Sequence, residues 1–124
     1  ASAFYLGGVT SYANSVKTNV LGVSESIIEK YGAVSSECVA AMAEGVRKIT
    51  GSDFSVATSG IAGPGGGSEE KPVGLVYVAV DSDKYSEVLK LNIPSRSDDA
   101  REYIRYIASS HALHLVWKAA GFFD

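Results

Sequence analysis

The most regular hydrophobic pattern in the 124-residue chain predicts a helix between Ser35 and Gly51. Apolar residues recur there at three- and four-residue spacing, at Val39, Met42, Ala43, Val46 and Ile49. This spacing places them on one helix face, with the charged residues mostly on the other side. Ser35 or Ser36 is suited to cap the N-terminus, and Gly51 stands where a helix-ending glycine is expected.

Two shorter helices are expected before it. Residues 15–21 are long enough for one or two helical turns. Ser24 is a suitable N-cap for a second helix, which carries Ile27 and Ile28 and ends at Gly32.

A long helix is expected to close the chain. Ser95 and Asp98 approximate a capping box, from which the helix runs to about Ala119. Its apolar stripe is formed by Ile104, Ile107, Ala108, His111 and Leu115. His111 on this stripe is either a core histidine or a catalytic one. The apolar face of this helix, together with Phe122 and Phe123, is also a candidate dimer contact.

Four segments are expected to be strands: residues 9–12, 53–58, 73–80 and 86–93. The third reads VGLVYVAV, a nearly continuous apolar run that is typical of a strand covered on both faces. The polar turn before the fourth is so short that these two strands should pair antiparallel. The element order predicts an α/β fold with a mixed central sheet and helices on its faces.

The segment 58–74, TSGIAGPGGGSEEKPVG, is a glycine-rich loop between two expected strands. Its glycines are Gly60, Gly63, Gly65, Gly66, Gly67 and Gly74. Backbone amides of such loops hold anions and carboxamide or phosphate oxygens, and Lys71 adds a positive charge. The spacing fits neither the Walker A loop nor the dinucleotide fingerprint. The loop therefore either holds a small-molecule ligand or is a surface hairpin loop.

Three cationic side chains are candidates for chemistry or anion binding. Lys17 is either a general base, with a hydroxyl nucleophile as its partner, or a solvated surface residue. Arg101 and Arg105, one helical turn apart, either grip an anion or pair with nearby acidic residues. Cys38 near a helix start is either an activated thiol or a structural residue. No histidine, cysteine and carboxylate cluster has metal-ligand spacing.

Composition narrows the classes of function. The net charge is −3 and no long basic run exists, which disfavours nucleic acid as a partner. Apolar runs are too short to span a membrane, and a single cysteine excludes an intramolecular disulfide framework. A cytoplasmic location is expected. The chain starts at Ala1 and enters an apolar segment at once, so we expect it to be one incomplete domain over residues 1–124.

Four stretches together resemble the CinA C-terminal domain family, whose enzymes include nicotinamide-nucleotide amidases. GIAGPGGGSEEKPVG is similar to the family's long loop signature. The other three, which occur in the family's order, are GGVTSYANSVKTNVLGV, GAVSSECVAAMAEGV and REYIRYIASSHAL. The resemblance implies a three-layer α/β/α sandwich, of which the first strand and helix lie outside this chain.

The resemblance also implies a reaction: deamidation of nicotinamide mononucleotide to nicotinate mononucleotide and ammonia, by a serine that a lysine activates. It needs no metal or redox cofactor. It assigns catalysis to Lys17, with Tyr12 beside it. The matching binding residues for the reacting carbonyl and ribose phosphate are Asn14, Thr58, Ser59, Gly60, Gly63, Gly65, Gly66, Gly67, Lys71 and Arg101.

The sequence departs from the family at the nucleophile. The family's serine lies in a Glu-Ser-Cys-Thr-Gly-Gly stretch before the lysine, and that stretch does not occur in these residues. We therefore expect the serine to lie outside this chain. The alternative is a non-catalytic nucleotide-binding or regulatory domain of a CinA-type protein. An unpaired sheet edge would favour a homodimer or higher homo-oligomer.

Overall fold

The structure is a computed structural model that describes residues 3–94 and 99–122. Its elements, in chain order, are α1 (Asn14–Asn19), α2 (Glu25–Tyr31), α3 (Ser36–Thr50), β1 (Phe54–Gly60), β2 (Leu75–Ser82), β3 (Ser86–Asn92), α4 (Ala100–Trp117) and the short π-helix η1 (Lys118–Phe122). The helices predicted near α1, α2 and α3 are confirmed, as are the three strands that follow them.

The three strands form one antiparallel sheet in the order β1-β2-β3. Ala57 lies opposite Ala79, and Val78 lies opposite Leu89. The mixed sheet predicted from the sequence depended on a strand at residues 9–12. Those residues instead run past the sheet without strand pairing, so the expected strand there is wrong and the described pairing is antiparallel throughout.

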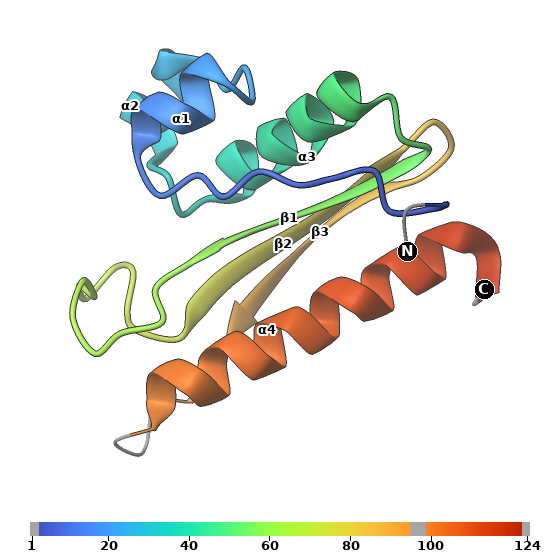
Figure 1. The fold of residues 1–124 in the computed structure, drawn as a ribbon. Coiled ribbons are helices and arrows are strands. Elements are labelled where there is room, and N and C mark those ends of the chain that lie inside the picture. The colour runs from blue at the N-terminus through green and yellow to red at the C-terminus, as the bar shows by residue number, and fades with distance from the viewer. Residues whose placement is uncertain (1–2, 95–98, 123–124) are drawn as a thin grey trace.

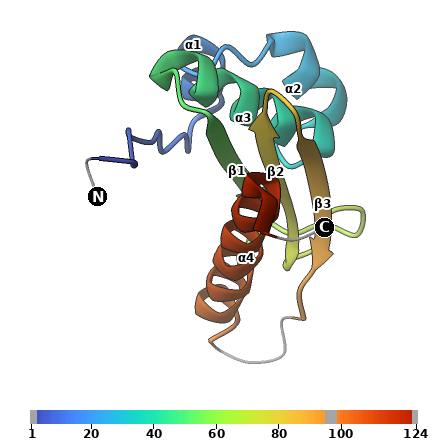
Figure 2. The same cartoon turned by 90° about the vertical axis from the view of Figure 1, so that its right-hand side faces the viewer.

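Helices cover both faces of the sheet, as the α/β/α layering predicted. Figure 1 shows α1, α2 and α3 on one side of the strands and α4 on the other, and Figure 2 gives the turned view. Two buried clusters follow from this arrangement. Val39, Ala43 and Val23 belong to the core between α3 and the sheet, whereas Val78 and Ile104 belong to the core beneath α4.

Local capping explains why the helices of the first layer begin and end where they do. The Ser24 hydroxyl accepts a hydrogen bond from the Ile27 amide, and the Ser35 hydroxyl accepts one from the Cys38 amide at 3.1 Å. Ser35, not Ser36, is therefore the cap of α3. Gly51 closes α3 in the left-handed conformation, with φ of 70°.

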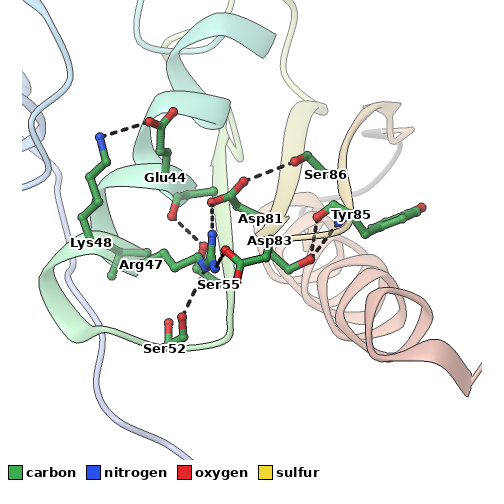
Figure 3. A network of polar contacts seen from close by, with 12 residues as sticks. Glu44, Arg47, Lys48, Ser52, Ser55, Asp81, Asp83, Tyr85 and Ser86 are labelled. Carbon is green, nitrogen blue, oxygen red and sulfur yellow. Dashed lines mark hydrogen bonds and ion pairs between the residues drawn. The ribbon is translucent and has the colours of Figure 1, made fainter.

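The far end of α3 is tied to the β2–β3 hairpin by Arg47. Its guanidinium donates to the Ser52 carbonyl at 3.2 Å and forms ion pairs with Asp81 and Asp83, as Figure 3 shows. Hydrogen bonding to Arg47, with its charge, lowers the pKa of Asp83. These contacts bond the guanidinium of Arg47 within the protein. The network therefore has a structural role, which is to hold the helix and the hairpin together.

Helix α4 differs from the sequence prediction at two positions. Its N-cap, Asp99, makes no side-chain capping bond, and the predicted capping box of Ser95 and Asp98 lies outside the described residues. His111 is exposed, so neither its assignment to the apolar stripe nor a core role holds. The buried face consists of Ile104, Ala108, Ala112 and Leu115. None of the helices in the described ranges is long and apolar enough to cross a membrane.

Candidate active site

A cavity of about 570 Å³ opens where β1 ends, between α1 and α4. The residues that line it come from α1, α3 and one side of α4, from the end of β1 and from β2, and from the segments before α1, between α2 and α3 and after β1. The sequence-predicted residues that the fold brings together here are Tyr12, Asn14, Lys17, Thr58, Ser59, Gly60 and Arg101.

Lys17 is the buried residue of the short helix α1, with 6% of its surface exposed. It lies on the cavity wall, and its Nζ donates a hydrogen bond to the Ser11 carbonyl oxygen. That bond fixes the direction of the amine. The surface position weighed from the sequence is therefore wrong, and a buried amine on a cavity wall is positioned to exchange protons with a bound molecule.

The end of β1 supplies another part of the cavity wall. The Ser59 hydroxyl donates a 2.7 Å hydrogen bond to the Ala33 carbonyl, which joins the strand to the α2–α3 turn. A side chain at Gly60 would meet the Leu75 carbonyl at 2.8 Å, so only glycine fits where the two strands pack this closely. Ser59 and Gly60 thus line the cavity, while the Ser59 hydroxyl is bonded within the protein.

Two arginines of α4 complete the site. Arg101 lines the cavity and donates from Nη1 to the Gly63 carbonyl at 2.9 Å. Arg105 lines it one turn later, followed by Ser109 after another turn. These arginines place two guanidinium groups at the cavity, and no carboxylate among the described residues lines it. This charge distribution favours an anionic ligand.

Ser109 was not identified from the sequence as a site residue. The sequence feature that could have identified it is the four-residue spacing of Arg101, Arg105 and Ser109, which places all three on one side of a helix. The spacing alone did not indicate which side of the helix would border a cavity, because that depends on packing against β1.

The first residues of the glycine-rich segment line the cavity, whereas its glycines after Gly60 lie outside the lining. Gly65, Gly66 and Gly67 are exposed and do not line the cavity, nor do Gly63 and Lys71. Lys71 instead donates from Nζ to the Tyr31 carbonyl at 2.6 Å, at the end of α2. The loop is therefore held at both ends, by Arg101 on one side and by Lys71 on the other.

Cys38 lies fully buried near the start of α3. Burial raises the pKa of its thiol, and the nearby charges of Lys17 and Lys71 only partly oppose this effect. The thiol is therefore held neutral, which favours the structural role over an activated nucleophile. In the described part of the chain, no three histidine, cysteine or carboxylate side chains are grouped to hold a metal ion.

Comparison with known proteins identifies the family. The family model of the CinA C-terminal domain matches residues 1–120. The chain belongs to the CinA C-terminal domain family. A CinA-like protein of Pseudothermotoga lettingae is 50% identical over 118 residues, which are 95% of this chain and 28% of that protein. This CinA-type chain thus spans less than a third of the length of that relative.

Solved structures support the same assignment. The competence/damage inducible protein CihA from Agrobacterium tumefaciens superimposes with a TM-score of 0.80 at 36% identity, over 86% of this chain and 63% of that one. The competence damage-inducible protein A from Klebsiella pneumoniae gives a TM-score of 0.76 at 30% identity, over 93% and 72% respectively. The CinA-type fold predicted from the four sequence motifs is therefore confirmed.

Proposed function

We propose that the protein to which this chain belongs hydrolyses the carboxamide of nicotinamide mononucleotide, releasing nicotinate mononucleotide and ammonia. The observation that carries the proposal is the buried amine of Lys17 on the wall of a cavity lined by two arginines. Family membership supports an amidase, and the charge of the cavity supports a phosphorylated substrate.

The cavity suits a mononucleotide in size and in charge. A volume of about 570 Å³ lies within the range of small-molecule sites, roughly 300–1,000 Å³. Arg101 and Arg105 hold the phosphate, because their guanidinium groups match its oxygens. This assignment keeps Arg101, which the resemblance implied, and replaces the glycine loop and Lys71 with Arg105 of α4.

The reaction begins when the amine of Lys17 takes the proton of a serine hydroxyl as its oxygen attacks the carboxamide carbon. The serine is proposed to come from a segment outside these residues, because the family's serine motif does not occur among them. The tetrahedral intermediate collapses as Lys17 returns the proton to the leaving nitrogen and ammonia departs. Water, deprotonated by the same amine, then cleaves the acyl-serine and restores the hydroxyl.

The remaining wall residues have supporting roles. The main-chain amide of Gly60, at the end of β1, supports the oxyanion, a contribution of about 3 kcal/mol for one donor. Tyr12 and Asn14 border the same cavity as Lys17, and Tyr12 is 85% exposed. Its ring is thus accessible at the cavity mouth, where it can cover the pyridine of the substrate.

The test compares nicotinamide mononucleotide with the corresponding riboside, which lacks the phosphate. Arg105→Gln in the full-length protein should raise KM for the mononucleotide about 10- to 100-fold, since a charge-assisted hydrogen bond contributes about 1.5–3 kcal/mol. It should leave riboside turnover unchanged. Lys90→Gln, on exposed β3, is the matched control. Equal effects on both substrates would mean that Arg105 does not bind the phosphate.

The second candidate is a nucleotide-binding or regulatory domain without catalysis. The observation that favours it is the lack of the family's serine motif among these residues. Calorimetry with the mononucleotide, run beside an ammonia assay on the full-length protein, separates the two. Binding without ammonia release would support the regulatory domain, and turnover would support the amidase.

A further inference from the structure

The cavity reaches both faces of the sheet. Strand β1 lies at the edge of the described sheet, and its side chains alternate between the two faces. Ser59 faces the layer of α1, α2 and α3, because its hydroxyl bonds the Ala33 carbonyl, so the preceding Thr58 faces α4 (Figure 1). Ser59 and Thr58 both line the cavity. Lys17 lines it on the first side of the sheet and Arg105 on the second, so a ligand that fills it passes around the edge of β1.

The two ends of the cavity carry different groups. The end beside α4 carries the two arginines. The end beside α3 carries the amine of Lys17 together with the apolar side chains of Ala33, Val34 and Met42. Small-molecule sites are commonly built in this way, from apolar walls with a few polar groups that fix the orientation of the ligand. We call Ala33, Val34 and Met42 the α3 wall.

Met42 connects the α3 wall with the protein core. It is the largest side chain of the α3 wall, and only 7% of its surface is exposed. In the described part of the chain, it is the one buried residue of the core between α3 and the sheet that also lines the cavity. The core of this layer therefore reaches the cavity through a single side chain, and the length of that side chain affects the shape of the cavity.

Met42 and the amine of Lys17 lie at the same end of the cavity. Burial raises the pKa of the Cys38 thiol, and the charge of Lys17 partly opposes this effect, which requires the amine to lie near the first turn of α3. Met42 follows Cys38 by four residues and so lies one turn further along the same side of α3. A molecule whose reacting carbon is held at Lys17 therefore has the atoms next to that carbon at the α3 wall.

A methionine is well suited to contact a flat ring. Its side chain is unbranched, and its polarizable sulfur makes favourable contacts with aromatic rings. In the proposed reaction, the carbon that the serine attacks is bonded directly to a pyridine ring. We infer that Met42 forms the floor of the binding site for this ring and is a specificity-determining residue, because its length sets the size of ring that the α3 wall accepts. The inference rests on the proposed function.

Shortening Met42 should enlarge the space for the ring. An engineered core cavity of about 150 Å³ holds a benzene molecule, which is the room that one additional fused ring needs. Met42→Ala removes every side-chain atom beyond Cβ and therefore opens space of this order at the α3 wall. The matching probe is an analogue of nicotinamide mononucleotide in which a benzene ring is fused to the pyridine on the side away from the ribose. We call it the fused-ring analogue.

Calorimetry with the full-length protein tests the inference. It measures Kd for nicotinamide mononucleotide and for the fused-ring analogue, and the ratio of the two values reports the size of ring that the site prefers. The wild type should bind the analogue at least ~10-fold more weakly than the mononucleotide, because Met42 occupies the space of the added ring. In Met42→Ala the ratio should shift at least ~10-fold toward the analogue. A purely structural role of Met42 would weaken the binding of both and leave the ratio unchanged.

Further variants separate ring contact from core packing. Met42→Leu conserves the volume of the side chain and should keep the wild-type ratio within about threefold. Val39→Ala truncates a fully buried residue of the same helix that does not line the cavity, so it should lower stability but leave the ratio unchanged. Circular dichroism checks that each variant is folded. If Met42→Ala does not fold, Met42→Val is the smaller truncation and should shift the ratio about threefold in the same direction.

An ammonia assay on the same samples distinguishes this inference from the proposed function. A shifted ratio without ammonia release would support the ring site and contradict the amidase. A ratio that stays constant in the truncated Met42 variants would overturn the inference, with or without ammonia release, and so would an equal shift in Val39→Ala. Wild-type protein that binds neither nucleotide would overturn both.

Discussion

The ammonium group of Lys71 donates a 2.6 Å hydrogen bond to the carbonyl oxygen of Tyr31, at the C-terminal end of α2. The contact holds the end of the glycine-rich loop over Gly32, where a side chain would lie 2.7 Å from the Lys71 Nζ. A positive charge at a helix C-terminus is favourable, since the carbonyl groups there carry partial negative charge. Lys71 is therefore bound to the protein itself.

Replacing Lys71 with Met should lower the free energy of unfolding by about 1 kcal/mol, because the substitution removes a charge-assisted contact that is partly open to water. KM for nicotinamide mononucleotide should change less than about twofold. Urea unfolding and steady-state kinetics measure the two effects. A rise in KM above about tenfold with unchanged stability would mean that Lys71 and the glycine-rich loop bind the phosphate.

Gly45 on α3 lies against the backbone of the segment between α1 and α2, and a Cβ there would stand 1.8 Å from the Leu21 carbonyl oxygen. Gly45→Ala should therefore destabilise the protein by about 3 kcal/mol or more, although alanine is ordinarily the better helix residue by about 1 kcal/mol. Gly65→Ala is the control, because nothing lies within 4 Å of its added Cβ. Equal unfolding midpoints for the two variants would contradict this packing.

Cys38 should make the protein less stable at alkaline pH. Burial raises the pKa of its thiol in the folded state above the unfolded value of about 8.5. Its contribution is therefore fully present below pH ~8.5 and is lost as pH rises through the folded pKa, by at most about 1.4 kcal/mol per pH unit. Between pH 8 and 10, the free energy of unfolding measured in urea should fall more for the wild type than for Cys38→Ala. Parallel curves for the two proteins would contradict the shift.

Local features of the sequence predicted most of the helices and strands. Ser24, Ser35 and Gly51 act through hydrogen bonds or dihedral angles within a few residues, so the pattern alone identifies them. Residues 9–12 were misjudged because an apolar segment becomes a strand only where a neighbouring strand offers pairing. His111 was misjudged because the helical period places it near the buried face, whereas the packing of α4 leaves it exposed.

Local sequence patterns predicted less of the candidate site than of the fold. Lys17 and Arg101 are 84 positions apart in the sequence, and it was the resemblance to a known family that linked them before the fold showed one cavity. The glycine content of the loop predicted a ligand-binding role. Gly74 instead satisfies a backbone demand: with φ of 100° it leaves room for the Ile93 carbonyl, which a Cβ would meet at 2.0 Å. Composition thus identified a conformational requirement but not a ligand.

Ammonia release by Lys17→Met in the full-length protein is the most direct measurement of the proposed mechanism. Methionine keeps the length and the buried stem of lysine but removes the amine that exchanges the proton. We expect kcat for nicotinamide mononucleotide to fall about 10²- to 10⁴-fold, with calorimetric binding of the substrate retained and Lys90→Met unaffected. Undiminished ammonia release by a folded Lys17→Met protein would contradict the account.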